Sequence, residues 1–177
     1  MPFLFILLAD RMGLDVTAST APLHVFVKFT DDATGTTFNV EATSGANPAK
    51  DSWYAKNLPM TDIALKNGVY MQSLTRQEAV VVMATVSVEH HLQKKQYNKA
   101  IEMAELLLPH YPKYAYLYTK IGTAYHGILK DNFYKRYPAL KDIPKQERQV
   151  YQFLSEQNHL AFDKAEALGW RPKEQVR

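Results

Sequence analysis

The sequence contains no cysteine among its 177 residues. This absence excludes disulfide bonds, thiolate sites for zinc or iron–sulfur clusters, and a thiol nucleophile within the chain. Any chemistry that these residues carry must therefore use imidazole, carboxylate, hydroxyl or amine groups, or a group supplied by another molecule.

Long runs of one charge sign are also missing, since 21 basic residues are interspersed with 18 acidic ones. A nucleic-acid partner is therefore not expected, although Lys135, Arg136 and the segment 141–145 offer one or two phosphate contacts. The content of 46% hydrophobic and 22% charged residues is typical of a folded globular chain. No cofactor and no metal ion is predicted.

The apolar run Met1–Ala9 is too short to span a bilayer, which takes about 20 residues. No basic residue precedes it and Asp10 interrupts it, so a secretion signal is not favoured and a cytoplasmic location is predicted. The run predicts a core helix over 3–12 that ends at Gly13. This segment is interpreted as a helix truncated at its start, with a true amino-terminal helix or a targeting remnant as alternatives. Exposure of its apolar face over 3–8 predicts homo-oligomerisation.

The residues after this helix have the composition of strands. Alternating and β-branched residues predict strands over 15–21, 23–30 and 36–43, and the Asp- and Gly-containing segment 31–35 predicts a hairpin turn. A long polar loop is predicted over 44–59, and loops of this length are more often functional than idle.

From residue 76 onward the periodicity is helical. Helices are predicted over 76–95, 97–108, 114–129 and 146–168. Thr75 followed by Glu78 is typical of a capping box, and Gly169 is expected to end the last helix. The predicted fold class is α+β, a small antiparallel sheet followed by an all-α array, with domains at 1–72 and 73–177.

The helical half also has the spacing of tetratricopeptide repeats, interrupted by an insertion at about 133–150. The residues that match are Ala100, Ala104, Leu107, Pro112, Tyr118, Ile121, Gly122, Tyr125, Phe162 and Ala165. Repeats of this kind predict a protein or peptide partner, and an ordinary helical hairpin is the alternative. The many tyrosines of this half are expected to pack between helices or to line a peptide-binding surface.

His24 begins one predicted strand, while Asn39 and Glu41 lie on the next. A general base needs this arrangement, because an acceptor must hold its second ring nitrogen and stabilise the imidazolium. Asn39 is the preferred partner and Glu41 the alternative; a His24 bonded only by backbone is the non-catalytic interpretation. Trp53 and Tyr54 in the predicted loop are candidates for substrate binding or for packing.

The segments 22–27 and 38–45 resemble the histidine and acid strands of the transglutaminase-like superfamily, which are papain-like Cys–His–Asp proteins. A bacterial branch is also similar in carrying tetratricopeptide-type helices afterwards, so the resemblance covers 3–170 and implies a bacterial protein. It implies that His24 is the catalytic base and that Asn39, in place of Asp, orients it.

The resemblance also implies a nucleophilic cysteine just before the helix that corresponds to 3–12. We therefore expect the chain to start just after this cysteine and, as given, to lack thiol acyl-transferase or amidase activity. The alternative is a non-catalytic helical module for protein–protein interaction, with a decayed catalytic sheet as its platform.

Overall fold

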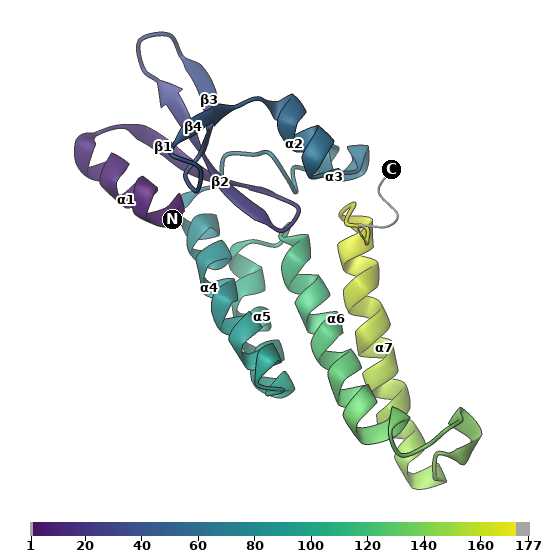
Figure 1. Cartoon of the computed structure of the whole chain (residues 1–177). Coiled ribbons are helices and arrows are strands. Elements are labelled where there is room, and N and C mark those ends of the chain that lie inside the picture. Colours follow the sequence, from purple (N-terminus) through teal and green to yellow (C-terminus); the bar gives the residue numbers. More distant parts are fainter. Residues whose placement is uncertain (1, 173–177) are drawn as a thin grey trace. The chain divides into compact units, whose positions relative to one another are not determined.

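A computed structural model describes residues 2–172 and confirms the α+β fold class. These residues form two compact units: 2–83 together with 168–172, and 84–167. The first unit contains the sheet and the second is helical (Figure 1). The tetratricopeptide-like array and the partial transglutaminase-like core stay predictions.

The first unit is an antiparallel sheet with helices before and after it. Its elements are α1 (Pro2–Met12), β1 (Asp15–Ala21), β2 (His24–Asp31), β3 (Thr36–Glu41), β4 (Asn47–Ala49), α2 (Asp51–Asn57), α3 (Asp62–Lys66) and the start of α4 (Arg76–Gln93). The strands pair in chain order. Each connection is therefore a short turn between neighbours.

Helix α1 ends at the predicted glycine. The backbone N–H groups of Gly13 and Leu14 donate to carbonyls of the last turn, at 3.3 and 3.0 Å, in the pattern of a Schellman motif. The helix packs along β1 and β2 (Figure 1). Apolar residues of its other face are half exposed: Leu4, Leu7 and Leu8. Homo-oligomerisation through this face stays a prediction.

The register of the sheet places Phe26 of β2 opposite Ser19 of β1. Phe26 is buried with Ala21 and Tyr54 in a core cluster on this face of the sheet. The outer edge of β1 is covered, because the N–H groups of residues 71 and 74 donate to its carbonyls at 2.9 and 2.8 Å. The cluster and the covered edge hold the strand that begins at His24 in a fixed position.

The predicted loop over 44–59 is wrong, because this segment contains strand β4 and helix α2. Sequence signals for both are weak: β4 has three residues including Pro48, and Lys50, at the N-cap of α2, makes no side-chain capping bond. Tyr54 of α2 packs on Phe26, so tertiary packing rather than local propensity stabilises this helix.

The second unit consists of the rest of α4 and the elements that follow it. These are α5 (Tyr97–Leu107), η1 (Leu108–His110), α6 (Ala115–Leu129), the π-helical turn η2 (Lys130–Tyr134), η3 (Leu140–Asp142) and α7 (Lys145–Ala167). The close approach of α6 and α7 requires Gly122, since a methyl group there would lie 2.6 Å from the ring of Phe162. Within residues 2–172, no helix is long and apolar enough to cross a membrane.

The capping box predicted before α4 is confirmed. The N–H of Thr75 donates to a carboxylate oxygen of Glu78 at 2.8 Å, and the N–H of Glu78 donates to the Thr75 hydroxyl at 3.2 Å. Two orphan donors of the first turn are thereby satisfied.

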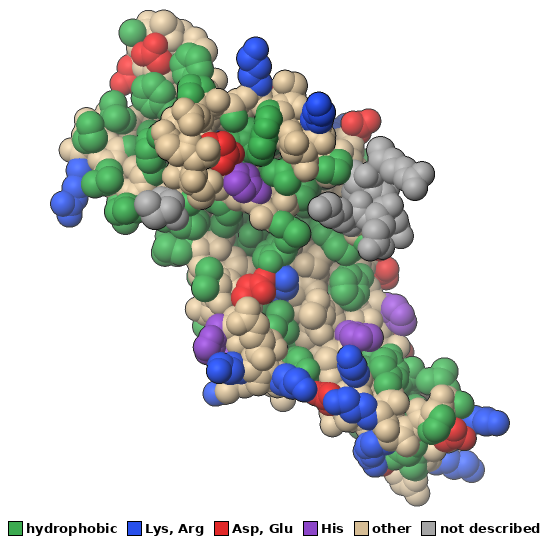
Figure 2. All heavy atoms as spheres, in the orientation of Figure 1, with side chains coloured by type: hydrophobic (Ala, Val, Ile, Leu, Met, Phe, Trp, Pro, Cys, Tyr) green, Lys and Arg blue, Asp and Glu red, His purple; other side chains and the backbone are tan. Residues whose placement is uncertain are grey.

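The net charge is concentrated in one segment of the second unit. Residues 130–148 contain six basic and three acidic residues, so this segment carries a net +3, equal to that of the whole chain. Figure 2 shows Lys and Arg side chains around apolar ones at the end of the second unit where η2 and η3 lie. The remaining residues of the chain are neutral in sum.

Candidate active site

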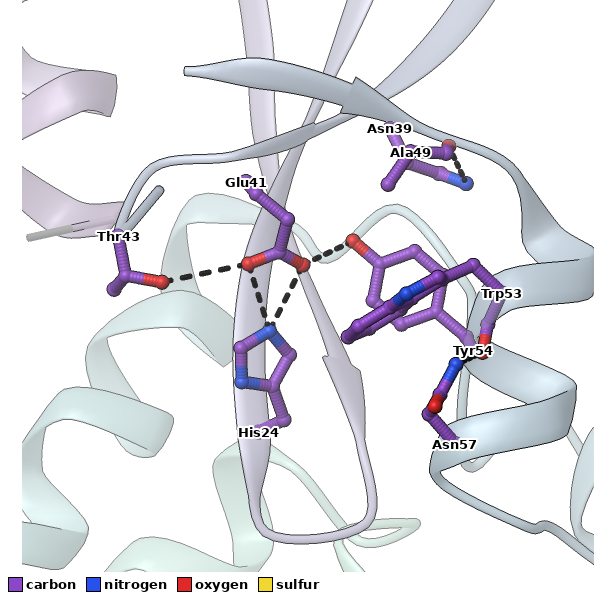
Figure 3. A network of polar contacts seen from close by, with 8 residues as sticks. All are labelled: His24, Asn39, Glu41, Thr43, Ala49, Trp53, Tyr54 and Asn57. Atoms are coloured by element: carbon purple, nitrogen blue, oxygen red, sulfur yellow. Dashed lines mark hydrogen bonds and ion pairs between the residues drawn. The ribbon is translucent and has the colours of Figure 1, made fainter. Parts of the chain in front are cut away.

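His24 and Glu41 form the centre of a polar network on the sheet of the first unit (Figure 3). The Nε2 atom of His24 lies 2.9 Å from Oε1 and 3.0 Å from Oε2 of Glu41. Their side chains are 25% and 12% exposed, so the pair is largely shielded from solvent but not sealed from it. A charge-assisted contact of this kind is stronger than one in bulk water.

The alternative partner Glu41, rather than the preferred Asn39, contacts the His24 ring. Strand β3 pairs with β2 so that Asn39 lies opposite Lys28, and continuing this register places residue 43 opposite His24. Glu41 is then the diagonal neighbour of His24 on the same face, within reach of its ring, whereas Asn39 lies two residues further along the strand. The alternative, Glu41, is therefore the residue that binds the imidazole.

Asn39 has another role in the same unit. Its side-chain amide donates to the carbonyl of Ala49 at 3.2 Å and to the Asp51 carboxylate at 2.5 Å. Since Ala49 ends β4 and Asp51 begins α2, this buried asparagine connects the sheet to the start of the helix that carries Tyr54. Asn39 thus supports the network from a distance.

Tyr54 belongs to the network, while Trp53 lies at its margin. The Tyr54 ring is fully buried, stacks on Phe26 with centroids 4.3 Å apart, and its hydroxyl donates to Oε1 of Glu41. Burial raises the pKa of Tyr54 well above its usual range, and the hydrogen bond and charge of Glu41 raise it further. Trp53 is 46% exposed and meets the Tyr54 ring edge-on. Tyr54 is therefore held inside the unit against Glu41, whereas the Trp53 side chain reaches the surface.

The contacts define the tautomer of His24. An ionised carboxylate only accepts hydrogen bonds, so Nε2 carries the hydrogen and, in the neutral ring, Nδ1 has the lone pair. No other described residue bonds to Nδ1, which lies on the side of the ring away from Glu41 (Figure 3). The ring is oriented opposite to that of a chymotrypsin-type triad, in which the acid binds Nδ1. In this tautomer, Nδ1 is the ring atom that can accept a proton.

Replacing Tyr54 with phenylalanine is expected to lower the free energy of unfolding of the first unit by about 1.5 kcal/mol at pH 8, because Glu41 loses a charge-assisted hydrogen bond. Above the pKa of 10.0 of a free tyrosine, the unfolded wild-type chain gains stability by ionising at this residue. The cost of the substitution should then shrink, by up to about 1.4 kcal/mol per pH unit. Denaturation of both proteins at pH 8 and pH 11 tests this; equal costs at the two pH values contradict it.

A second polar cluster lies in the helical unit. Glu89 of α4 accepts from the Tyr116 hydroxyl and from Lys120 Nζ at 2.8 Å, and the Lys120 ammonium lies 4.3 Å from the centre of the Tyr116 ring. Burial alone would raise the pKa of Glu89, but the hydrogen bonds and charge of its partners outweigh it and lower the pKa. With every group paired, the cluster ties α4 to α6 rather than forming a reactive site.

Within residues 2–172, no group of three or more His, Asp or Glu side chains could hold a metal ion. His90 and His91, at the end of α4, have ring centroids 5.9 Å apart, and His91 Nδ1 contacts the Gln96 side chain at 2.8 Å.

Comparison of the chain with protein-family models, curated proteins and solved structures finds no match.

Proposed function

We propose that the sheet of the first unit carries the imidazole and acid groups of a thiol-dependent acyl-transferase or amidase site, as the resemblance to transglutaminase-like proteins implies. The observation that supports the proposal is the two-oxygen contact of Glu41 with Nε2 of His24, at 2.9 and 3.0 Å. It orients the ring, leaves the Nδ1 lone pair available, and provides a negative charge for the imidazolium.

In this function, Nδ1 of His24 takes the proton of a thiol, and the resulting thiolate attacks the carbonyl carbon of an amide or ester. The imidazolium, stabilised by Glu41, then returns its proton to the departing amine or alkoxide, which leaves a thioester. Transfer of the acyl group to water or an amine releases the thiol. The sequence contains no cysteine, so the 177 residues by themselves are expected to form no thioester.

Supplying the thiol from solution tests the proposal. With N-acetylcysteamine as nucleophile and a 4-nitrophenyl ester as substrate, the chain is expected to accelerate thiol-dependent nitrophenolate release about 10²-fold, the lower end of general-base effects. His24→Gln should abolish this acceleration, because glutamine cannot accept the proton. His90→Gln is the matched control, since His90 is an exposed imidazole of the helical unit.

Equal rates for the wild type and His24→Gln contradict the catalytic proposal. Circular dichroism of both proteins must show the same helical content, so that the comparison is between folded chains. A rate that depends on His24 without added thiol also contradicts it, because the nucleophile would then not be a thiol.

The second candidate is a non-catalytic module that binds a protein partner through the helices of the second unit. It is favoured by large apolar side chains on α7 that face solvent at helical spacing: Val150, Phe153 and Leu160 are 55%, 54% and 46% exposed. Exposed apolar stripes of this kind are typical of interaction surfaces. If the thiol experiment shows no dependence on His24, the catalytic proposal is rejected and protein binding becomes the proposed function.

A further inference from the structure

The insertion between α6 and α7 contains a pocket of about 320 Å³ that the proposed catalytic site does not use. Its floor is formed by Phe133 and Ile143, which are 4% exposed and belong to a core cluster with Leu129 and Leu154. Its rim includes Tyr134 and other accessible apolar residues. The volume is at the low end for small-molecule sites, which run from about 300 to 1,000 Å³, and suits one large side chain.

The walls of the pocket are held in place by α7. Both oxygens of Glu147 accept from the guanidinium of Arg136, at 3.1 and 3.2 Å, and one also accepts from the Tyr137 hydroxyl at 3.0 Å. The guanidinium of Arg148 donates to the carbonyls of Ile143 and Lys141 at 3.0 and 3.3 Å. The pocket is therefore formed before any ligand binds, which lowers the entropic cost of binding.

The backbone at the pocket is unusual as well. Helix α6 ends in the π-helical turn η2, which places Phe133 and Tyr134 at the pocket. Such turns are rare and are frequent at functional sites. Two large residues of the rim are accessible to solvent, since Tyr134 is 46% and Leu140 63% exposed.

The charge around the pocket is positive and unbalanced. Arg136 is neutralised by Glu147 and Lys135 by Asp131. In the described part of the chain, by contrast, no ion pair includes the remaining lysines of the segment: Lys130, Lys141 and Lys145. Lys141 directly follows the rim residue Leu140, and the next residue, Asp142, accepts from the N–H of the rim residue Ala139 at 3.1 Å. Figure 2 shows Lys and Arg side chains beside apolar ones at this end of the second unit.

From this juxtaposition we propose that the pocket binds an acidic peptide segment of a protein partner. A large apolar side chain of the peptide enters the space above Phe133 and Ile143, and carboxylates on either side of it contact the unpaired lysines. A nucleic acid fits less well, because the floor offers no polar group to a base edge and acidic side chains interrupt the basic ones. This binding function is independent of His24.

The apolar contact is tested by fluorescence anisotropy with a fluorescein-labelled peptide of sequence EEDDFDDEE. Leu140→Asp is expected to weaken binding at least tenfold, because it removes an apolar rim contact and introduces repulsion. Leu106→Asp is the matched control: Leu106, on α5, is 66% exposed and does not line the pocket. A peptide with serine in place of phenylalanine should also bind at least tenfold more weakly.

The charge contribution is tested with the double variant Lys141→Glu and Lys145→Glu, for which a tenfold weaker affinity and a smaller salt dependence are expected. The control is Lys94→Glu with Lys99→Glu, which changes the net charge equally on exposed residues elsewhere in the second unit. Equal affinities of the two double variants overturn the proposal. Binding of a dT12 oligonucleotide or of phosphatidylserine vesicles with the same sensitivity to Leu140→Asp also overturns it, in favour of a nucleic-acid or membrane surface.

Discussion

Replacing Glu41 with alanine is expected to lower the free energy of unfolding of the first unit by about 3 kcal/mol, since hydrogen bonds to a charged group contribute about 1.5–3 kcal/mol each. The Glu41 carboxylate accepts from His24 and from the hydroxyl of Tyr54. Tyr54 is fully buried, so without Glu41 its hydroxyl keeps the cost of desolvation and loses its partner. The total free energy of unfolding of a native protein is about 5–15 kcal/mol, so the expected loss is a large fraction of the stability.

Intrinsic fluorescence during urea denaturation measures this effect in the right part of the molecule, because Trp53 and Trp170 both belong to the first unit. Glu41→Gln is expected to cost about half as much, since the amide oxygen still accepts one hydrogen bond. Asp32→Ala is the matched control: it removes an exposed acid from the turn of the same hairpin and should change the free energy by less than about 0.5 kcal/mol. A Glu41→Ala chain as stable as this control contradicts the importance of the network.

The sequence predicted the hairpin that carries the site better than the pairing within it. Alternation in 23–30 and the turn residues at 31–35 are sufficient to predict both strands and to place His24 near a polar residue of the next strand. Which residue that is depends on the register, and the register depends on the conformation of the turn at 31–35. Here the backbone N–H of Gly35 donates to the carbonyl of Asp31 at 2.7 Å, and the pairing that follows brings Glu41, not Asn39, to the imidazole.

The sequence suggests Tyr54 only as a loop residue for substrate binding or packing, and does not predict its contact with Glu41. Its helix has seven residues and its N-cap residue makes no side-chain capping bond, so neither periodicity nor capping indicates it. The residue is placed by contacts with Phe26 and Glu41, which lie 28 and 13 residues away along the chain. Sequence patterns detect contacts within an element, whereas this phenol is held by contacts between elements.

Replacing Gly169 with alanine is expected to destabilise the first unit by about 4 kcal/mol, through a steric clash added to backbone strain. Gly169 has a φ of +103° and follows α7 where the chain returns to α3. A methyl group there would lie 2.3 Å from the backbone nitrogen of Ala64, which cannot move without disturbing α3. The Thr61 hydroxyl also donates to the Gly169 carbonyl at 2.6 Å, so a displaced backbone would lose this bond as well.

Gly35→Ala is the control for strain in a left-handed turn, because Gly35 has a positive φ of +66° but no atom within 4 Å of the added methyl group. It should cost about 1–2 kcal/mol from strain alone. The difference between the two variants, measured by the fluorescence of Trp53 and Trp170, then reports the clash with Ala64 together with the added strain of the larger φ at Gly169. If Gly169→Ala is no more destabilising than Gly35→Ala, residues 168–172 do not pack on α3 in solution. In that case the fluorescence change should come from Trp53 alone, which the variant Trp170→Phe would show.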